Sequence, residues 1–163
     1  MQPSTNPWAL NPHVAEFLAL EYPGAKILEL GGGTGSPYLH HLNSDVLTVE
    51  HDPDWITYLE GMGCRYLAVP MEAGWYLPSK ELGQAMAAAQ VIIVDGPPGR
   101  KRANFMQHLH RVPPGCVVVL DDAHRAEIAN LEDHARDNLG WLPVEAFHDG
   151  RRRAVLLQKP HRP

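Results

Sequence analysis

Glycines and acidic residues gather after two apolar, β-branched runs in the first third of the chain. Glu29 lies at the end of one run, and glycines alternate along the turn that follows it: Gly31, Gly33 and Gly35. Glycines there let backbone amide groups approach a ligand closely where a helix begins. Glu50 ends the next run, 19 residues after Gly31, where a carboxylate that binds a ribose is expected. The spacing predicts a site for a nucleoside cofactor; the alternative is that the glycines only form a tight turn.

Three more carboxylates follow two fully apolar runs further along the chain. Asp95 comes after QVIIV, and Asp121 and Asp122 come after CVVVL. In open parallel sheets ligands bind beyond the carboxyl ends of the strands, so these acids should border one ligand space. Oxygen ligands suit hard cations, so the cluster predicts a Mg²⁺ site. The alternative needs no metal, because Asp121 could cap the following helix while Asp122 pairs with Arg125.

Basic side chains flank these acids. Besides Asp95, the residues His124 and Lys101 could take a proton from an acceptor hydroxyl, and we expect these three to be the catalytic groups. Arg100 follows the fourth strand, and Arg151 precedes the last strand. Both should border the same face of the sheet, where they would suit an anionic substrate. The alternative is a solvated edge whose charges pair with neighbouring acids.

The elements that must position these residues alternate along the chain. A short β-branched run comes first in each unit and a segment with helical spacing follows, which is typical of a parallel sheet. We expect strands at residues 26–30, 45–50, 65–69, 90–94, 116–120, 141–147 and 153–157. We expect helices at residues 12–22, 37–42, 52–61, 79–88, 102–112 and 125–139, after a lead segment at residues 1–11. Asp149 and Gly150 separate the last two runs, which indicates a hairpin and an antiparallel last strand.

Length and composition bound the classes of protein. The 163 residues predict one domain over residues 1–163. With 14 Lys and Arg against 19 Asp and Glu, the net charge of −5 does not favour nucleic acid as a partner. Cys64 and Cys116 lack CxxC spacing, and no stretch reaches about 18 apolar residues or follows a signal-peptide pattern. We therefore expect a cytoplasmic protein that binds a small molecule and no membrane; a homo-oligomer stays open.

The residues from Glu29 to Gly35 resemble the first motif of the class I S-adenosylmethionine-dependent methyltransferases, an acid-x-Gly-x-Gly-x-Gly. The resemblance covers roughly residues 12–159. It implies a doubly wound, Rossmann-like α/β fold whose seven-stranded, mostly parallel sheet has the order 3-2-1-4-5-7-6 and an antiparallel last strand. It also implies that Glu29, Gly31 and Gly33 surround the methionine part of the cofactor and that Glu50 binds the ribose. A carboxylate beside this turn would repel a pyrophosphate, but it suits a cofactor with a charged α-amino group.

The end of the third strand departs from the family pattern. The family often has Gly-Asp-Ala there, with the Asp at the adenine amino group, whereas this chain has Val69-Pro70-Met71-Glu72. We expect Met71 against the adenine face and Glu72 near the adenine edge. The alternative for Met71 is an ordinary place in the core.

The acids Asp95, Asp121 and Asp122 resemble the metal-binding group of the metal-dependent O-methyltransferases, in which substrate hydroxyls coordinate the ion. We therefore expect methyl transfer to a small polar, anionic acceptor at oxygen, in which the protein supplies proximity and alignment. Two alternatives come from other classes. One is a non-catalytic nucleoside-binding domain that acts as a sensor or an assembly subunit. The other is an NAD-dependent dehydrogenase, which Glu29 and the lack of a second domain disfavour.

Overall fold

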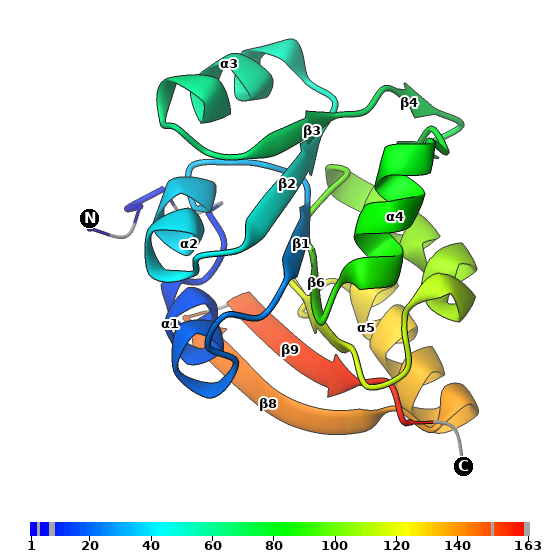
Figure 1. Ribbon diagram of the computed structural model, residues 1–163. Helices are drawn as coiled ribbons and strands as arrows, with labels where there is room; N and C mark the ends of the chain where they lie inside the picture. The colour runs from blue at the N-terminus through cyan, green and yellow to red at the C-terminus, as the bar shows by residue number, and fades with distance from the viewer. Residues whose placement is uncertain (3, 7–8, 151, 162–163) are drawn as a thin grey trace.

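The computed structural model of the protein describes residues 1–2, 4–6, 9–150 and 152–161. Its seven-stranded sheet has the order β3-β2-β1-β6-β7-β9-β8 (Figure 1). The strands are β1 (Ile27–Leu30), β2 (Val46–Glu50), β3 (Tyr66–Ala68), β6 (Val91–Val94), β7 (Val117–Leu120), β8 (Leu142–Asp149) and β9 (Arg152–Gln158). β9 runs antiparallel to both of its neighbours, β7 and β8, and the other neighbouring strands pair in parallel. The predicted α/β doubly wound sheet, its strand order and its antiparallel last strand are confirmed.

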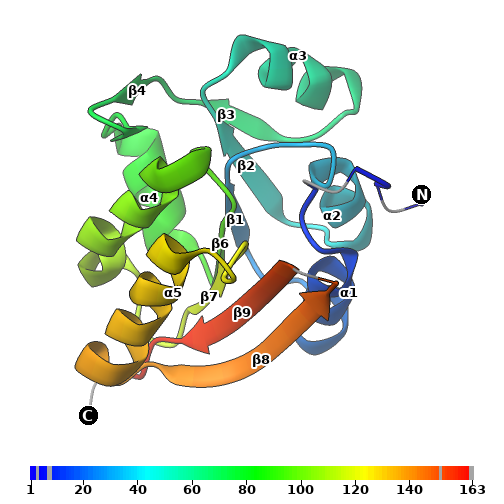
Figure 2. The same ribbon diagram turned by 180° about the vertical axis from the view of Figure 1, so that it is seen from behind.

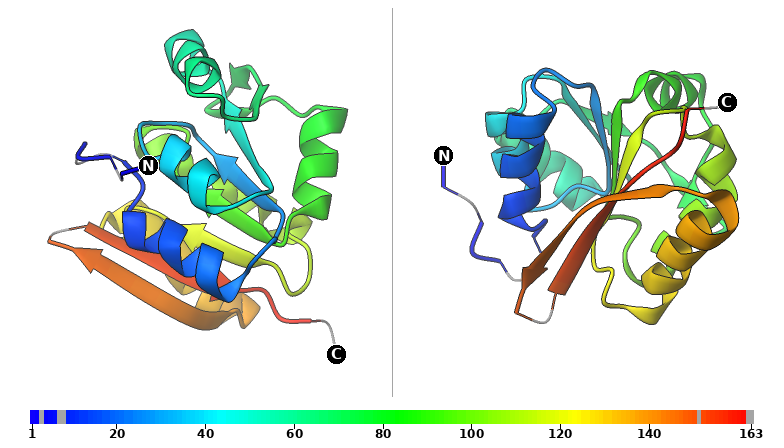
Figure 3. Two further views of the ribbon diagram at one scale, coloured as in Figure 1. Left: turned by 60° about the vertical axis from the view of Figure 1, so that its left-hand side comes forward. Right: turned by 90° about the horizontal axis from the view of Figure 1, so that it is seen from below.

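Helices cover both faces of the sheet (Figures 2 and 3). One face carries α1 (Pro12–Glu21) and α2 (Ser36–Leu42). The other face carries α4 (Lys80–Ala88), the 3-10 helix η1 (Gly99–Arg111) and α5 (Ala126–Asp133). At the edge of the sheet, α3 (Pro53–Gly61) lies beside β3 (Figure 1). None of the described helices is long and apolar enough to span a membrane.

Alternation along the central strands divides the core in two. Side chains on one face of the sheet pack with α4, η1 and α5: Ile92, Val94, Val118 and Leu120. Side chains on the other face pack with α1 and α2: Val91, Ile93, Val117 and Val119. Each strand is therefore buried on both faces, as its continuous apolar run requires.

Two predicted helices differ from the structure. The helix expected at 102–112 is the 3-10 helix η1, which begins earlier, at Gly99. In a 3-10 helix residues three apart lie on one face, so Arg102, Phe105 and His108 share a face. Arg102 and Phe105 are buried. The helix expected at 125–139 ends at Asp133 and continues as the π-helical turn η2 (His134–Asn138).

A short ribbon that the sequence did not indicate lies between β3 and α4. Its strands, β4 (Met71–Glu72) and β5 (Trp75–Tyr76), pair in antiparallel fashion. The turn has positive φ at Ala73 (50°) and Gly74 (82°), as tight hairpins require. Asn104 of η1 donates a hydrogen bond to the Gly74 carbonyl (3.1 Å). The ribbon is therefore attached to η1.

Candidate active site

The loop between β1 and α2 lies against the loop that follows β6. Gly31 has a φ of 93°, which favours glycine, and a Cβ placed on it would lie 2.5 Å from the Cα of Gly96. The two loops therefore touch through backbone atoms, at the point where the strand order reverses. A Cβ on Gly33 would meet no described atom within 4 Å. This part of the loop is open to a ligand.

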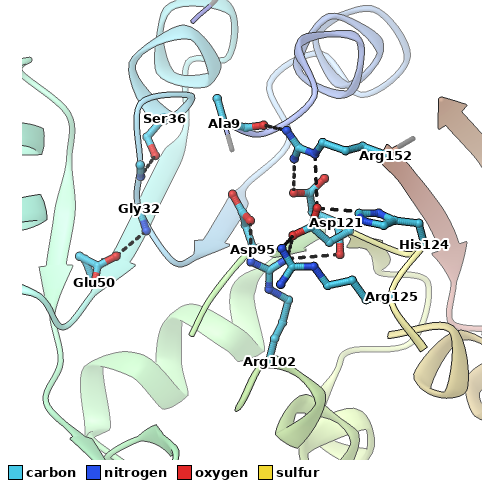
Figure 4. Close-up of polar contacts among 12 residues, drawn as sticks. Ala9, Gly32, Ser36, Glu50, Asp95, Arg102, Asp121, His124, Arg125 and Arg152 are labelled. Atoms are coloured by element: carbon cyan, nitrogen blue, oxygen red, sulfur yellow. Dashed lines mark hydrogen bonds and ion pairs between the residues drawn. The ribbon is translucent and has the colours of Figure 1, made fainter. Parts of the chain in front are cut away.

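Glu50 ends β2 and fixes the same loop. Its buried carboxylate accepts hydrogen bonds from three backbone amides, those of Gly32 (2.7 Å), His51 (2.6 Å) and Asp52 (2.9 Å). Figure 4 shows the contact with Gly32. Asp52 also caps the N-terminus of α3 with its side chain. The carboxylate thus holds the Gly-rich loop and the start of α3 in a fixed relation.

A pocket of about 130 Å³ lies at the carboxyl ends of β1, β2 and β6. Residues in its wall include Gly31, Glu50, His51, Tyr76 and Asp95. A larger hollow of about 410 Å³ lies at the opposite edge, between α4 and the starts of β1 and β2, and includes none of them. The structure therefore brings Gly31, Glu50 and Asp95 together, although they come from three separate segments.

Glu29 lies outside this pocket, buried in the sheet. Its carboxylate accepts a hydrogen bond from the Thr48 hydroxyl (2.6 Å), and His40 Nε2 lies 2.9 Å from the same hydroxyl oxygen. Burial raises the pKa of Glu29 to about 7, although hydrogen bonds from Thr48 and Ser36 act in the opposite direction. Glu29 does not line the pocket, so its place beside the methionine part of a cofactor stays a prediction.

A Glu29→Gln variant should reveal this raised pKa as a pH-dependent difference in stability. The folded protein binds the Glu29 proton more tightly than the unfolded chain does, so the free energy of unfolding falls as pH rises from 4.5 to about 7. The wild type should lose on the order of 3 kcal/mol relative to Glu29→Gln across that range. Urea unfolding of both proteins at several pH values measures this difference, and a gap that is constant with pH would contradict it.

The predicted adenine contacts lie on the ribbon. Met71 is half-buried and packs against the core, while Glu72 is exposed. Neither residue is part of the pocket wall. The packing of Met71 agrees with the core alternative, and a contact of either residue with adenine stays a prediction.

The lead segment packs across the Gly-rich loop. Ala9 and Leu10 are buried, and a Cβ on Gly35 would lie 2.9 Å from the amide nitrogen of Leu10. The Ser4 hydroxyl donates to the Thr34 hydroxyl (3.0 Å). Close approach of the lead segment therefore accounts for the glycine at position 35, which was predicted as a cofactor contact.

Three carboxylates and three arginines form one mostly buried cluster beside the pocket (Figure 4). Arg102 on η1 bridges Asp95 (3.0 Å) and Asp122 (3.0 Å). Arg152 on β9 contacts Asp121 (3.0 Å) and Asp122 (3.3 Å). We call the whole set the carboxylate–arginine network: Asp95, Asp121, Asp122, Arg102, Arg125 and Arg152.

Asp122 is the centre of this network. Its φ of 57° is uncommon for a residue with a side chain, although aspartate tolerates it. All three arginines contact its carboxylate, Arg125 at 2.9 Å. Burial and the charge of Asp121 raise the pKa of Asp95 well above its usual range, and burial also raises the pKa of Asp121. Asp95 and Asp121 therefore keep a proton to higher pH than free aspartates do.

The predicted Mg²⁺ site does not fit this arrangement. Asp95, Asp121 and Asp122 do meet at one edge of the sheet, but guanidinium groups bridge them and balance their charge. Mg²⁺ needs open oxygen ligands in near-octahedral geometry. Within the described part of the chain, no group of three or more His, Cys, Asp and Glu side chains could hold a metal ion. The contact of Asp122 with Arg125, which was the metal-free alternative, is present.

Removal of divalent metal ions should leave the thermal stability of the protein unchanged. Because Arg102 and Arg152 already compensate the carboxylates, the Tm in EDTA should equal the Tm in excess Mg²⁺. Thermal unfolding in the two buffers measures this. A Tm that rises with Mg²⁺ in the wild type, but not in Asp95→Asn, would restore the metal site.

The basic residues predicted beside the acids lie in different places. His124 Nδ1 is 4.0 Å from an Asp122 carboxylate oxygen, on an exposed side chain. Lys101 is exposed and lies near the ribbon turn, so the next residue, Arg102, reaches the acids in its place. The three-residue repeat of η1 explains the difference, since it turns position 102 inward. Arg100 is exposed at the start of η1, and Arg151 lies outside the described residues.

A scan against protein-family models gives no match, and neither does a search of curated proteins. Solved structures do match. A methyltransferase from Pyrococcus furiosus is 17% identical, with a TM-score of 0.60 over 97% of this chain and 88% of that chain. The C-terminal domain of precorrin-6Y C5,15-methyltransferase from Rhodobacter capsulatus is 18% identical, with a TM-score of 0.55 over 98% and 93%. The T. thermophilus 16S rRNA N2 G1207 methyltransferase, in complex with AdoMet and guanosine, is 19% identical, with a TM-score of 0.61 over 100% and 43%.

The chain has the class I methyltransferase fold. Three residues of the site on this fold were missed by the sequence analysis: Arg102, Arg152 and Tyr76. Spacing in the sequence pointed to two of them. Arg102 stands three residues before Phe105, so both lie on one face of the helix. Arg152 is next to Arg153, which contacts Glu132 on α5, so alternation along the strand directs Arg152 to the opposite face of the sheet. No spacing pointed to Tyr76, since a two-residue strand is too short to show a pattern.

Proposed function

We propose that the chain is an S-adenosylmethionine-dependent methyltransferase that acts on a small polar acceptor at oxygen. The observation that carries the proposal is the meeting of Gly31, Glu50 and Asp95 in one pocket at the carboxyl ends of β1, β2 and β6. Ligands of doubly wound sheets bind at such a reversal of strand order. The fold shared with methyltransferases supports the same assignment.

The residues present suit a nucleoside that carries a cationic amino acid part. Glu50 can accept hydrogen bonds from ribose hydroxyls, and the open side of Gly33 leaves room beside the loop amides. The carboxylate of Glu50, in the pocket wall, favours a positively charged ligand over a pyrophosphate. This preference disfavours NAD.

Asp95 is the proposed proton acceptor. S-adenosylmethionine supplies an activated methyl group when it is bound. The chain would then hold the acceptor oxygen in line with that methyl group, since proximity and alignment supply much of the rate of such a transfer. Asp95 keeps 15% of its side chain exposed and takes the hydroxyl proton as the C–O bond forms and the S–C bond breaks. In its deprotonated form Asp95 is a stronger base than an ordinary aspartate, because its pKa is raised, and S-adenosylhomocysteine is left.

We also propose that Arg100 meets an anionic part of the acceptor. It is exposed at the start of η1, directly after the loop that forms the pocket wall at Gly96, Pro97 and Pro98. An exposed arginine can bind a carboxylate or a phosphate through two hydrogen bonds. His124, exposed beside Asp122, is a second candidate to receive a proton.

Calorimetric titration with S-adenosylhomocysteine and, separately, with NAD tests the proposed function. We expect S-adenosylhomocysteine to bind and NAD not to bind; binding of NAD alone would overturn the proposal. Methyl transfer from labelled S-adenosylmethionine to a panel of hydroxyl, amine and carboxylate compounds then separates an enzyme from a non-catalytic domain, which would bind and transfer nothing. Products methylated only at nitrogen would overturn the assignment to oxygen.

A further inference from the structure

One hydroxyl in the pocket wall lacks a partner. Tyr76 ends β5, is 3% exposed and lines the pocket with Glu50 and Asp95. Among the residues that the structure describes, the Tyr76 hydroxyl makes no hydrogen bond. Folded proteins normally avoid a buried polar group of this kind, because its lost hydration is not replaced. The missing partner therefore points to a ligand.

Packing fixes where this hydroxyl lies. A Cβ on Gly96 would be 2.8 Å from the hydroxyl oxygen, so the hydroxyl lies over the loop after β6, where that loop meets the Gly-rich loop. The Tyr76 ring is edge-on to His51 (6.2 Å between ring centroids) and to Trp75 (5.4 Å). Trp75 is stacked on His108 of η1 (5.0 Å). The side chain is therefore held from both sides as part of the pocket wall.

Neighbouring charges define the chemistry that the hydroxyl offers. Burial, together with the charges of Glu50 and Asp95, raises the pKa of Tyr76 well above its usual range. The group therefore stays a neutral hydroxyl that can donate one hydrogen bond and accept others. Two carboxylates beside it disfavour an anionic ligand group. A neutral polar atom, such as a sugar oxygen or a ring nitrogen, suits this position.

We propose that the Tyr76 hydroxyl hydrogen-bonds the nucleoside part of the bound cofactor, as a further specificity-determining contact beside Glu50. The inference rests on the proposed function. The nucleoside part is favoured because the same wall of the pocket carries Glu50, the expected ribose ligand, and the rings of His51 and Trp55. Flat rings and a carboxylate together match a base and a sugar better than an amino acid.

Tyr76→Phe tests this contact, because it removes the oxygen and keeps the ring. The Tm of the ligand-free variant should rise by about 2–4 °C, since the unsatisfied hydroxyl is gone. Its affinity for S-adenosylhomocysteine, measured by calorimetry, should fall about fivefold to tenfold. Its affinity for 5′-methylthioadenosine, which lacks the amino acid part, should fall by the same factor. Tyr38→Phe is the matched control: its hydroxyl donates to Glu16 (2.9 Å) outside the pocket, so ligand affinity should stay at the wild-type value.

Each of the other possible results of these binding measurements would overturn one step of the proposal. Unchanged affinity of Tyr76→Phe for S-adenosylhomocysteine, with or without a lower Tm, would remove the contact. A loss confined to S-adenosylhomocysteine, with 5′-methylthioadenosine unaffected, would move the contact to the amino acid part and overturn the nucleoside assignment. Wild-type protein that binds neither compound would overturn the proposed function itself, so the two failures are distinguishable.

Discussion

Replacement of Arg102 by alanine should lower the free energy of unfolding by about 3–5 kcal/mol, the largest change that we expect from one substitution. The Arg102 side chain is 7% exposed and bridges Asp95 and Asp122. Its removal leaves two carboxylates in the protein interior with one cation fewer. Loss of one partner costs more than the ion pair itself contributes, because the remaining charges stay out of water. Urea unfolding at neutral pH measures the change.

Arg136→Ala is the matched control for this experiment. Arg136 also contacts several carboxylates, but 42% of its side chain is exposed and solvent screens the charges. We expect this variant to unfold at nearly the wild-type urea concentration. A double variant, Arg102→Ala with Asp95→Asn, should recover part of the lost stability, because Asp95 is the carboxylate whose ion pair is lost with Arg102. Asp122, by contrast, keeps Arg125 and Arg152. Equal losses for Arg102→Ala and Arg136→Ala would mean that the carboxylate–arginine network stabilises the fold no more than a surface pair does.

Replacement of Glu50 by alanine should weaken binding of S-adenosylhomocysteine by about 1.5–3 kcal/mol, or roughly 10- to 150-fold. The variant loses the proposed ribose contact. It also loses the acceptor for the amides of Gly32, His51 and Asp52, so the Gly-rich loop is less well ordered before the ligand arrives. Calorimetry measures the affinity.

Glu60→Ala provides the control for Glu50→Ala. Glu60 is an exposed carboxylate on α3 and does not line the pocket, so this variant should bind the ligand as the wild type does. An affinity of Glu50→Ala equal to that of the wild type would refute the ribose assignment. A loss of equal size in Glu60→Ala would indicate a general effect of negative charge and would refute a specific contact at Glu50.

The sheet could be predicted because its signals are local. Each central strand is a β-branched run followed by turn residues, and Asp149-Gly150 marks the hairpin that makes β9 antiparallel. The ribbon could not be predicted in this way, since two-residue strands show no alternation. The type of η1 could not either, because a 3-10 helix and an α-helix differ in hydrogen bonding that composition does not reveal.

The acidic residues of the site could be predicted, but the groups that balance their charge could not. Asp95 and Asp121 follow adjacent parallel strands, so their meeting follows from topology. Whether a metal or an arginine balances them depends on the directions of distant side chains. Lys101 and Arg102 are adjacent cations, and Arg102 turns inward because η1 begins at Gly99, before the expected start at residue 102, so that Arg102 joins the buried face with Phe105. Because the arginines beside them could not be placed from the sequence, the three aspartates alone indicated a metal site, which the structure does not fit.

Arg152 also donates a hydrogen bond to the Ala9 carbonyl (2.7 Å), across 143 positions of sequence. During synthesis on the ribosome, β9 is the last strand of this sheet to emerge. Asp121 and Asp122 therefore leave the ribosome before the cation on β9 that helps to neutralise them. Until β9 inserts between β7 and β8, a nascent chain carries this acidic pair without Arg152 and lacks the anchor for its lead segment. The site is therefore completed late in the folding of each newly made chain, when Arg152 reaches its place in the sheet.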